Sequence, residues 1–390
     1  MTSDRIPRSA EDDYTEAAAA RRRDFIQERT GAELRHTGQY SAEPAVFAGN
    51  IENFTGIVQM PVGFAGPLLV NGEHAQGEFY VPFATTEGTL VASYDRGMSV
   101  TRAAGGVTVT VVDDAMQRAP VFVFNNAREA RDFSRWLKDF FGQIKQAAEA
   151  TTSSGKLRDI QQFAASKMVY LRFNYTTGDA AGQNMSGKAT DAACKWILDR
   201  YDGPIERFVL SGSMDTDKKY SQINTLHTRG KRVIAEVTLP RALLQERMRT
   251  TPEAMFAARL TSQLGGLMAG TTLNGIHPAN GVAAMFIATG QDEANTAESG
   301  AGLIYAEVTP DGDYYFSLTI PSLIVATHGG GTALPTQREC LGALGCVGSG
   351  KVRKFAEIVG AALLCGELSL SAAIVADEWV ESHDAYGRNR

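Results

Sequence analysis

Few residues of this sequence could build a disulfide framework or a zinc site. It has four cysteines and six histidines among 390 residues, and no two cysteines form a C-x-x-C pair. The spacing of Cys340 and Cys346 matches no common zinc pattern. Isolated cysteines of this kind are typical of proteins in a reducing compartment. We therefore expect reduced thiols, no metal and a cytoplasmic location.

Long hydrophobic runs are missing as well. The nearest approach is 359–376, which Glu367 interrupts, and it predicts a buried helix rather than a membrane span. The first residues lead into no apolar signal segment. The 38 basic residues are fewer than the 44 acidic ones, so the net charge is −6 and no basic footprint for nucleic acid is present. We expect neither a membrane nor a nucleic acid as a partner.

The glycine fingerprint of a Rossmann fold is also absent. No G-x-G-x-x-G follows a predicted strand. The glycine-containing segment 178–182 nevertheless separates a predicted strand from a predicted helix, where backbone N–H groups can contact a phosphate. If a dinucleotide binds to this chain, we expect it to bind on a different fold.

The sequence does contain an ordinary globular composition and a regular succession of elements. It is 44% hydrophobic and 21% charged, and its 390 residues suffice for two or three structural units. Residues 120–208 predict a strand, helix, strand, helix and strand, which is a compact α+β unit of ferredoxin-like type. The predicted division is an N-terminal helical segment over 1–48, a large domain of 49–119 with 209–390, and the inserted small domain over 120–208.

Shorter features are predicted from turn and helix signals. The pair Asn71-Gly72 predicts a hairpin turn, and the prolines and glycines of 60–67 predict a rigid loop. Thr85 or Thr86 is expected to cap a helix over 90–98. The other predicted elements are strands over 107–112, 168–173 and 231–239, helices over 11–30, 127–151, 157–165, 252–268 and 354–376, and a hairpin of 303–308 with 314–320.

The most polar segment, residues 211–219, follows a strand-like run. It places two acids and two lysines between Asp215 and Lys219. Lys218 is held charged by the neighbouring Asp217, and an ammonium at the end of a buried strand can stabilise a developing oxyanion. A solvated charged turn between a strand and a helix accounts for the same residues. This segment alone leaves both interpretations open.

Four further polar residues fit a proton-transfer network, namely Glu87, Asn280, Asp292 and His383. A glutamate whose pKa is raised by burial could deliver a proton. A histidine near the chain end could protonate a leaving thiolate. Structural explanations exist for each, because Glu87 can serve a capping box and His383 can be an exposed tail residue.

A series of motifs over residues 45–385 resembles the 3-hydroxy-3-methylglutaryl-coenzyme A (HMG-CoA) reductase family. The resemblance rests on several short signals that occur in the order and at the spacings of that family. The matching segments are Glu52-Asn53, 61–67, 84–88, 178–185, 217–219, 290–292, 329–332, 366–370 and 382–383.

This resemblance implies an α+β fold: a large domain around a central helix, with an inserted ferredoxin-like domain that binds the cofactor. It implies the reduction of HMG-CoA to mevalonate and coenzyme A with two NADPH, in a homodimer or homotetramer whose active sites lie between subunits. The implied catalytic residues are Glu87 as proton donor, Lys218 at the oxyanion, Asp292 tuning this pair, and His383 protonating the thiolate. The implied substrate-binding residues are Glu52, Asn53, Arg118, Ser211, Asp217, Lys219 and Asn280, and the cofactor-binding residues are Asp179, Ala181, Gly182, Gln183, Asn184 and Met185.

At some positions this chain carries a different residue from the family members that it resembles. Ala181 and Gln183 stand where animal members carry methionines, so the resemblance does not exclude NADH. Asn389 stands where eukaryotic members carry a phosphorylatable serine, so that switch should be absent. Two other functions stay open: NAD-dependent oxidation of mevalonate by the same fold, and coenzyme A binding without turnover. Cofactor preference distinguishes mevalonate oxidation from HMG-CoA reduction. Coenzyme A binding without turnover requires that one of the catalytic residues is missing.

Overall fold

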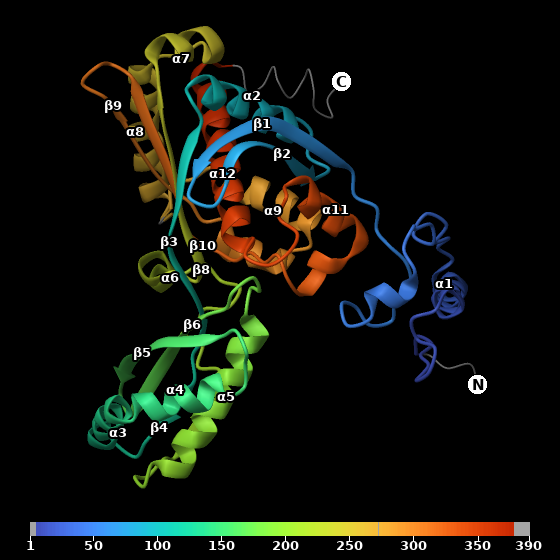
Figure 1. Ribbon diagram of the computed structural model, residues 1–390, viewed down its shortest axis with the longest axis vertical. Coiled ribbons are helices and arrows are strands. Elements are labelled where there is room, and N and C mark those ends of the chain that lie inside the picture. The colour runs from blue at the N-terminus through green and yellow to red at the C-terminus, as the bar shows by residue number, and fades with distance from the viewer. Residues whose placement is uncertain (1–4, 272, 378–390) are drawn as a thin grey trace.

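The computed structural model describes residues 5–271 and 273–377, so the predicted catalytic His383 lies outside the described residues. The N-terminal segment projects to one side of the rest of the chain (Figure 1), and Leu334 packs against its small core. Its helix α1 (Glu16–Thr30) begins at Thr15, whose hydroxyl accepts the N–H of Ala18, and ends at Gly31 in the left-handed conformation. With the 3-10 helix η1 (Pro44–Phe47), it packs around a small core that contains Ala19, Phe47 and Phe54.

The large part of the chain is organised on a mixed sheet. Strands β3, β8, β10 and β9 are antiparallel neighbours in that order, and β1 pairs antiparallel with β2 and parallel with β3. The strand bounds are β1 (Val62–Gly72), β2 (Gln76–Ala84), β3 (Val107–Arg118), β8 (Gly230–Leu239), β9 (Leu303–Val308) and β10 (Tyr314–Leu323). The predicted hairpin of 303–308 with 314–320 is therefore present as β9 and β10.

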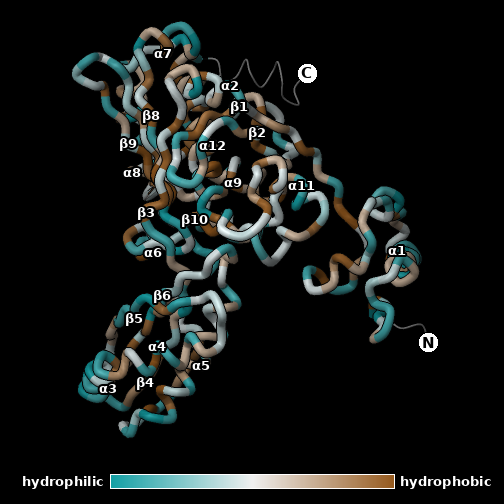
Figure 2. Tube along the Cα trace, viewed as in Figure 1, coloured by the Kyte–Doolittle hydropathy of each residue, from teal (hydrophilic) through white to brown (hydrophobic). Residues whose placement is uncertain are grey.

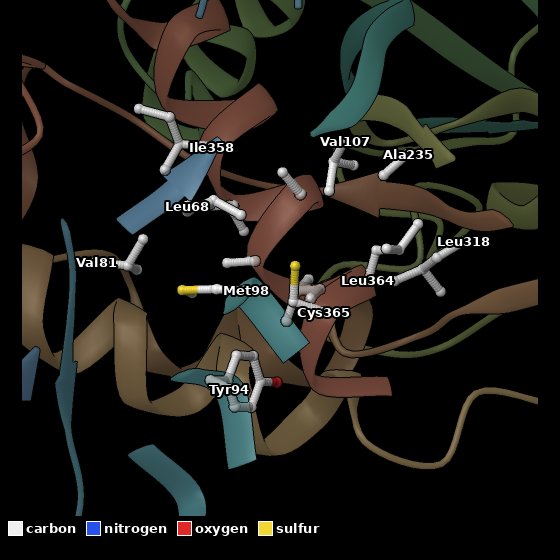
Figure 3. Close-up of a cluster of buried hydrophobic side chains, with 14 of the residues drawn as sticks. Leu68, Val81, Tyr94, Met98, Val107, Ala235, Leu318, Ile358, Leu364 and Cys365 are labelled. Atoms are coloured by element: carbon white, nitrogen blue, oxygen red, sulfur yellow. The ribbon is translucent and has the colours of Figure 1, made fainter. Parts of the chain in front are cut away.

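The central helix α12 (Val352–Val375) lies behind these strands, and most of its residues are fully buried. Figure 3 shows Leu364 and Cys365 of α12 among Leu68, Met98 and Leu318, which come from other elements of the core. Among the described residues, α12 is the one helix long and apolar enough to cross a membrane, and 78% of its apolar window is buried inside the protein. It is therefore the core helix that the sequence predicts. The helices around it are α2 (Leu90–Ala103), α6 (Gln222–His227), α7 (Arg241–Met248), α8 (Pro252–Met268), α9 (Pro278–Thr289), α10 (Thr296–Ser299) and α11 (Pro335–Ala343), with the 3-10 turns η2 (Glu293–Asn295) and η3 (Gly330–Ala333).

Helices α2 and α12 approach each other unusually closely. A Cβ atom on Gly97 would lie 2.0 Å from the carbonyl oxygen of Cys365, and one on Gly366 would lie 2.3 Å from the ring of Tyr94. Such distances are far shorter than any tolerated contact, so only glycine fits at both positions. The contact holds α2, and with it the loop before α2, against the core.

Residues 121–209 form a second sheet with its own core. The strand order is β7-β4-β6-β5, and all neighbours are antiparallel. The last residues of β3 pair with β6, which joins this sheet to the first. The elements are β4 (Val121–Val123), α3 (Ala127–Asp139), α4 (Phe141–Glu149), β5 (Lys156–Ala165), β6 (Met168–Thr176), α5 (Gln183–Arg200) and β7 (Arg207–Val209).

Two predicted helices of this second unit are wrong. Residues 157–165 form the edge strand β5, because pairing with β6 over its length outweighs the helix-forming residues of the segment. The predicted long helix over 127–151 is divided at Phe140 into α3 and α4.

Three predicted turn features also differ from the structure. Asn71 and Gly72 end β1, and the hairpin turn consists of 73–75, whose N–H groups donate to the buried carboxylate of Glu357. Residues 62–67, predicted as loop, are already part of β1. Helix α2 begins after Thr89 without a side-chain cap, whereas the Thr85 hydroxyl accepts the N–H of Glu87.

Candidate active site

The segment that carries Lys218 has a strained backbone. Ser213, Thr216 and Lys218 all have positive φ angles, of 66°, 55° and 57°. This conformation is uncommon for residues other than glycine and persists only where the surroundings hold it. Three such residues within six positions indicate that the loop shape is imposed by its contacts.

The buried guanidinium of Arg229 supplies much of that support. It donates from Nε to Glu298 at 3.1 Å and from Nη2 to Asp217 at 2.6 Å, and its side chain has 0% exposure. Burial raises the pKa of Glu298, whereas the charge of Arg229 acts in the opposite direction. The carboxylate of Glu298 also accepts the N–H of Lys219 at 3.3 Å. Arg229 therefore anchors the loop that carries Lys218 through Asp217 and Glu298.

Lys218 itself points to the turn after α9. Its Nζ lies 2.9 Å from Oδ2 of Asp292, and this hydrogen bond raises the pKa of Lys218 above its ordinary value. Asp292 also caps η2 by accepting the N–H of Ala294 at 3.1 Å. The structure thus brings together two of the predicted catalytic residues, with a lysine that stays charged.

Glu87 and Asn280 form the other predicted pair. The amide nitrogen of Asn280 lies 3.5 Å from Oε1 of Glu87 and 3.1 Å from Nδ1 of His277. His277 is buried, and burial lowers its pKa to about 4, so its ring is neutral near pH 7. Glu87 is exposed in the single chain, so the burial expected for it from the sequence is wrong for the isolated subunit.

The turn before α9 is held by Glu367 of α12. Its carboxylate accepts the N–H of Ile276 at 3.0 Å and that of His277 at 2.8 Å. Burial raises the pKa of Glu367 to about 7. The central helix thereby fixes the start of α9, where Asn280 lies.

The two pairs lie at opposite ends of α9. Asn280 is in the first turn of this helix of 12 residues, and Asp292 lies beyond its other end, after Gly290 and Gln291. A helix of that length spans about 18 Å. Within one chain, the pair of Glu87 with Asn280 is therefore separated from the pair of Lys218 with Asp292.

The remaining predicted substrate residues occupy several environments. Arg118 pairs with the buried Asp215 at 3.2 Å, and Nζ of Lys219 donates to the carbonyl of Asp217 at 2.9 Å. Ser211 is exposed near this loop in sequence, and Glu52 is exposed on the N-terminal segment. Asn53 has a φ of 52°, and its buried Oδ1 has no hydrogen-bond partner within the described residues.

The predicted cofactor motif surrounds the start of α5. The carboxylate of Asp179 is occupied by the N–H groups of 350–352 at the start of α12. These bonds lower the pKa of Asp179, against the effect of its burial. Gly182 has a φ of 85°, and a Cβ there would lie 2.2 Å from Thr177, so the turn into α5 requires glycine. Ala181 and Met185 are partly exposed and Asn184 is exposed, so this turn can be reached by a ligand.

One cluster has the spacing of a metal site. Glu73, His74 and Glu357 bring one potential ligand atom each within 4.8 Å of one another. The carboxylate of Glu357 already accepts N–H groups of the turn over 73–75. Its role as the acceptor for this turn explains its burial without an ion.

Sequence reasoning missed the residues that support the site. The predicted site residues do not include Arg229, Glu298, His277 or Glu367, although each contacts a predicted site residue or the turn that carries one. In the sequence these residues are recognisable only as charged or polar side chains among apolar neighbours. Their partners are distant in the chain, so this signal does not say what they hold.

The sequence is similar to those of known reductases. The family model described as hydroxymethylglutaryl-coenzyme A reductase matches residues 18–388. The 3-hydroxy-3-methylglutaryl-coenzyme A reductase of Pyrococcus abyssi is 45% identical over 375 residues, which cover 94% of this chain and 92% of that protein. The reductase of Haloferax volcanii is 42% identical over 379 residues, covering 96% of this chain and 93% of that protein.

Solved structures show the same fold. The class II 3-hydroxy-3-methylglutaryl-CoA reductase of Streptococcus pneumoniae, in a structure bound to NADPH, superposes with a TM-score of 0.69 at 22% identity. The match covers 85% of this chain and 89% of that one. The mixed α+β class predicted from the sequence is confirmed, and so is the predicted relationship. The chain belongs to the hydroxymethylglutaryl-coenzyme A reductase family.

Proposed function

We propose that this chain reduces HMG-CoA to mevalonate and coenzyme A with two NADPH, in the mevalonate pathway of isoprenoid synthesis. Family membership over nearly the whole chain supports the reaction. The observation that carries the proposal is the charged Lys218, which is held by Asp292 on a strained loop and is still reachable from solvent. An ammonium in that position suits an oxyanion formed from a thioester carbonyl.

The residues divide the reaction into two halves. NADPH supplies one hydride in each half. In the first, the ammonium of Lys218 hydrogen-bonds the oxyanion formed at the thioester carbon, the C–S bond breaks, and His383 gives a proton to the coenzyme A thiolate. In the second, Lys218 holds the oxyanion formed from mevaldehyde, and Glu87 provides the proton that completes the alcohol. Asp292 keeps Lys218 protonated throughout.

The substrate and cofactor sites follow from the same proposal. Arg118, Lys219, Asp217 and Ser211 would bind the carboxylate and hydroxyl of the substrate, with Asn280, Glu52 and Asn53 at its other side. The cofactor would lie at the start of α5, against Asp179, Ala181, Gly182, Gln183, Asn184 and Met185. The partial exposure of Ala181, Gly182 and Met185 supports this placement, because a ligand can reach the turn before α5.

The domain division is proposed along the two sheets. Residues 120–208 would be the inserted NADP-binding domain, with 1–48 as the N-terminal helical segment and 49–119 with 209–390 as the large catalytic domain. The order β7-β4-β6-β5 and the succession β-α-α-β-β-α-β support a ferredoxin-like inserted domain. Its separate hydrophobic core supports the same boundary.

We further propose that the active site is shared between two chains of a homodimer, or of a homotetramer built from such dimers. The separation of the two residue pairs by α9 supports this assembly, because a second subunit can bring its Glu87 to the Lys218 of the first. Exposed apolar side chains also favour it. On α8 these are Leu260, Leu264, Leu267 and Met268, with exposures of 52%, 60%, 72% and 81%. The apolar segment leading into β1 is visible in Figure 2 and includes Val58, which is 83% exposed.

A complementation experiment tests the shared site. Glu87→Gln and Lys218→Ala chains with different tags are coexpressed, and the mixed oligomer is purified through both tags. The purified mixed dimer should have about half of the wild-type activity, because one of its two shared sites combines an intact Glu87 from one chain with an intact Lys218 from the other. Activity that stays at the level of the single variants would place the whole site in one chain.

The reaction is tested by following reduced nicotinamide in the near ultraviolet. Purified protein and HMG-CoA are mixed once with NADPH and once with NADH. Faster loss of NADPH, with two oxidised per thioester, is the expected result. Faster loss of NADH would favour the mevalonate-oxidising alternative, and no loss with either would favour coenzyme A binding without turnover.

The free cysteines of the described chain support the proposed cytoplasmic location.

A further inference from the structure

The first residue of α5 connects the two loops that carry Lys218 and Asp292. The side-chain nitrogen of Gln183 donates to Oδ1 of Asn295 at 2.9 Å and to Oδ1 of Asp217 at 3.3 Å. Asp217 directly precedes Lys218, and Asn295 ends the 3-10 turn that Asp292 caps. One amide group of the small unit thus contacts both loops of the large one.

Both residues that accept hydrogen bonds from this amide are held in place by further hydrogen bonds. Asp217 also accepts from the fully buried Arg229 at 2.6 Å. Asn295 is 1% exposed, and its N–H donates to the carbonyl of Asp292 at 3.0 Å. Because these supports are rigid, a displacement of α5 has to stretch the two hydrogen bonds of Gln183 or move the loops with it.

The donors of Gln183 are fully used by these contacts. A primary amide has two N–H groups, and here one is directed to each loop. Its carbonyl oxygen is the only group left for a ligand. The side chain of Gln183 therefore holds the two loops, while its backbone stays at the turn where the cofactor is proposed to lie.

We propose that Gln183 is a positioning residue that couples the cofactor helix α5 to Lys218 and Asp292. The inference rests on the proposed function, since it concerns the same site. A cofactor that settles against the start of α5 would, through this side chain, set the separation of the lysine loop from the aspartate turn. Binding of the cofactor and alignment of the oxyanion-stabilising pair are thereby linked.

The test replaces the amide without shortening the side chain. Gln183→Met removes both donors at nearly constant length, and Gln183→Glu places a negative charge beside Asp217. Gln146→Met is the matched control, because Gln146 is exposed on α4 of the same unit. Three quantities are measured for each variant: kcat for HMG-CoA reduction, Kd for NADPH from fluorescence, and amide hydrogen exchange of the peptides that cover 213–219 and 292–296.

For Gln183→Met we expect kcat to fall about tenfold, as for the loss of a hydrogen bond to a charged group. The Kd for NADPH should change less than about twofold, because the side-chain nitrogen of Gln183 already donates to the two loops and the backbone of the cofactor turn is unchanged by the substitution. Amide exchange should become faster in both peptides. Gln183→Glu should lower kcat further, and Gln146→Met should change none of the three quantities.

Two results would overturn the coupling. A rise in the Kd for NADPH with unchanged kcat would make Gln183 a direct cofactor contact, and unchanged exchange in both peptides would show that it holds neither loop. If the wild-type protein lacks reductase activity but Gln183→Met still exchanges faster, the proposed function fails while the coupling stands. If Gln183→Met does not fold, the same measurements on Gln183→Glu decide.

Discussion

The ammonium nitrogen of Lys218 lies 2.9 Å from Oδ2 of Asp292, in a pair whose side chains are 43% and 37% exposed. An ion pair with that exposure contributes little to folding, because water weakens the attraction between the two charges in the folded chain. The charge of Lys218 is thus kept in place at small structural cost and remains accessible. This combination suits a group that has to meet a new negative charge during a reaction.

Removal of that ammonium should abolish both halves of the reaction. We expect Lys218→Ala to lower kcat at least about 100-fold for HMG-CoA and for added mevaldehyde, since both pass through an oxyanion. The free energy of unfolding should change by less than about 1 kcal/mol. Steady-state rates and urea denaturation measure these effects, with the exposed Lys195→Ala as control. Substantial mevaldehyde reduction by Lys218→Ala would contradict the assigned role.

Replacement of His383 should separate the two halves. We expect His383→Gln to slow the reduction of HMG-CoA at least about tenfold more than that of mevaldehyde, because only the thioester expels a thiolate that needs a general acid. The two rates are compared on one protein preparation. Equal losses with both substrates would argue against protonation of the thiolate by this residue.

Glu367 should make the protein less stable as the pH rises from about 5 to 7. In the folded chain burial raises its pKa to about 7, whereas the ordinary value is 4.5. Between these values the folded state binds more protons than the unfolded state, so raising the pH favours unfolding, by up to about 3 kcal/mol in total. The loss is complete above pH 7.

The measurement is urea denaturation of the wild type and Glu367→Gln between pH 5 and 8. Glutamine does not titrate, so the difference in unfolding free energy between the two proteins should change with pH in that window. The exposed Glu246→Gln serves as control and should follow the wild type. A constant difference between wild type and Glu367→Gln would mean that Glu367 is charged in the folded protein throughout.

The contact of α2 with α12 should not tolerate a methyl group. Gly97→Ala would place Cβ 2.0 Å from the carbonyl of Cys365, so we expect a loss of at least about 2 kcal/mol in unfolding free energy. Gly142→Ala on α4 meets nothing within 4 Å and should be neutral or slightly stabilising. Thermal and urea unfolding of both variants provide the comparison. Equal stability of Gly97→Ala and wild type would refute the close packing.

The elements with strong periodicity or clear end signals could be predicted from the sequence. The buried run of α12 and the hairpin of β9 with β10 are examples. The sequence predicts a helix for the edge strand β5 because its residues favour helices, whereas the pairing that makes it a strand comes from β6. The turn predicted at Asn71-Gly72 is wrong because the N–H groups of 73–75 are satisfied by Glu357, which lies 283 residues after His74.

The site shows a similar division. Lys218 and Asp292 could be identified because short motifs surround them, and the structure places them in contact. The supporting roles of Arg229 and His277 could not be predicted. Each depends on a contact, with Asp217 or with Asn280, that forms only in the folded chain. Local sequence thus indicates the groups that we propose to react, whereas the groups that orient them emerge from tertiary structure.

The position of α9 between the two residue pairs has a consequence for how this protein is assayed. If each reaction centre is completed by a second subunit, a chain on its own has no complete centre. Specific activity then depends on the protein concentration, and dilution below the dissociation constant of the dimer removes it. Rates determined at high dilution would report subunit association as much as chemistry.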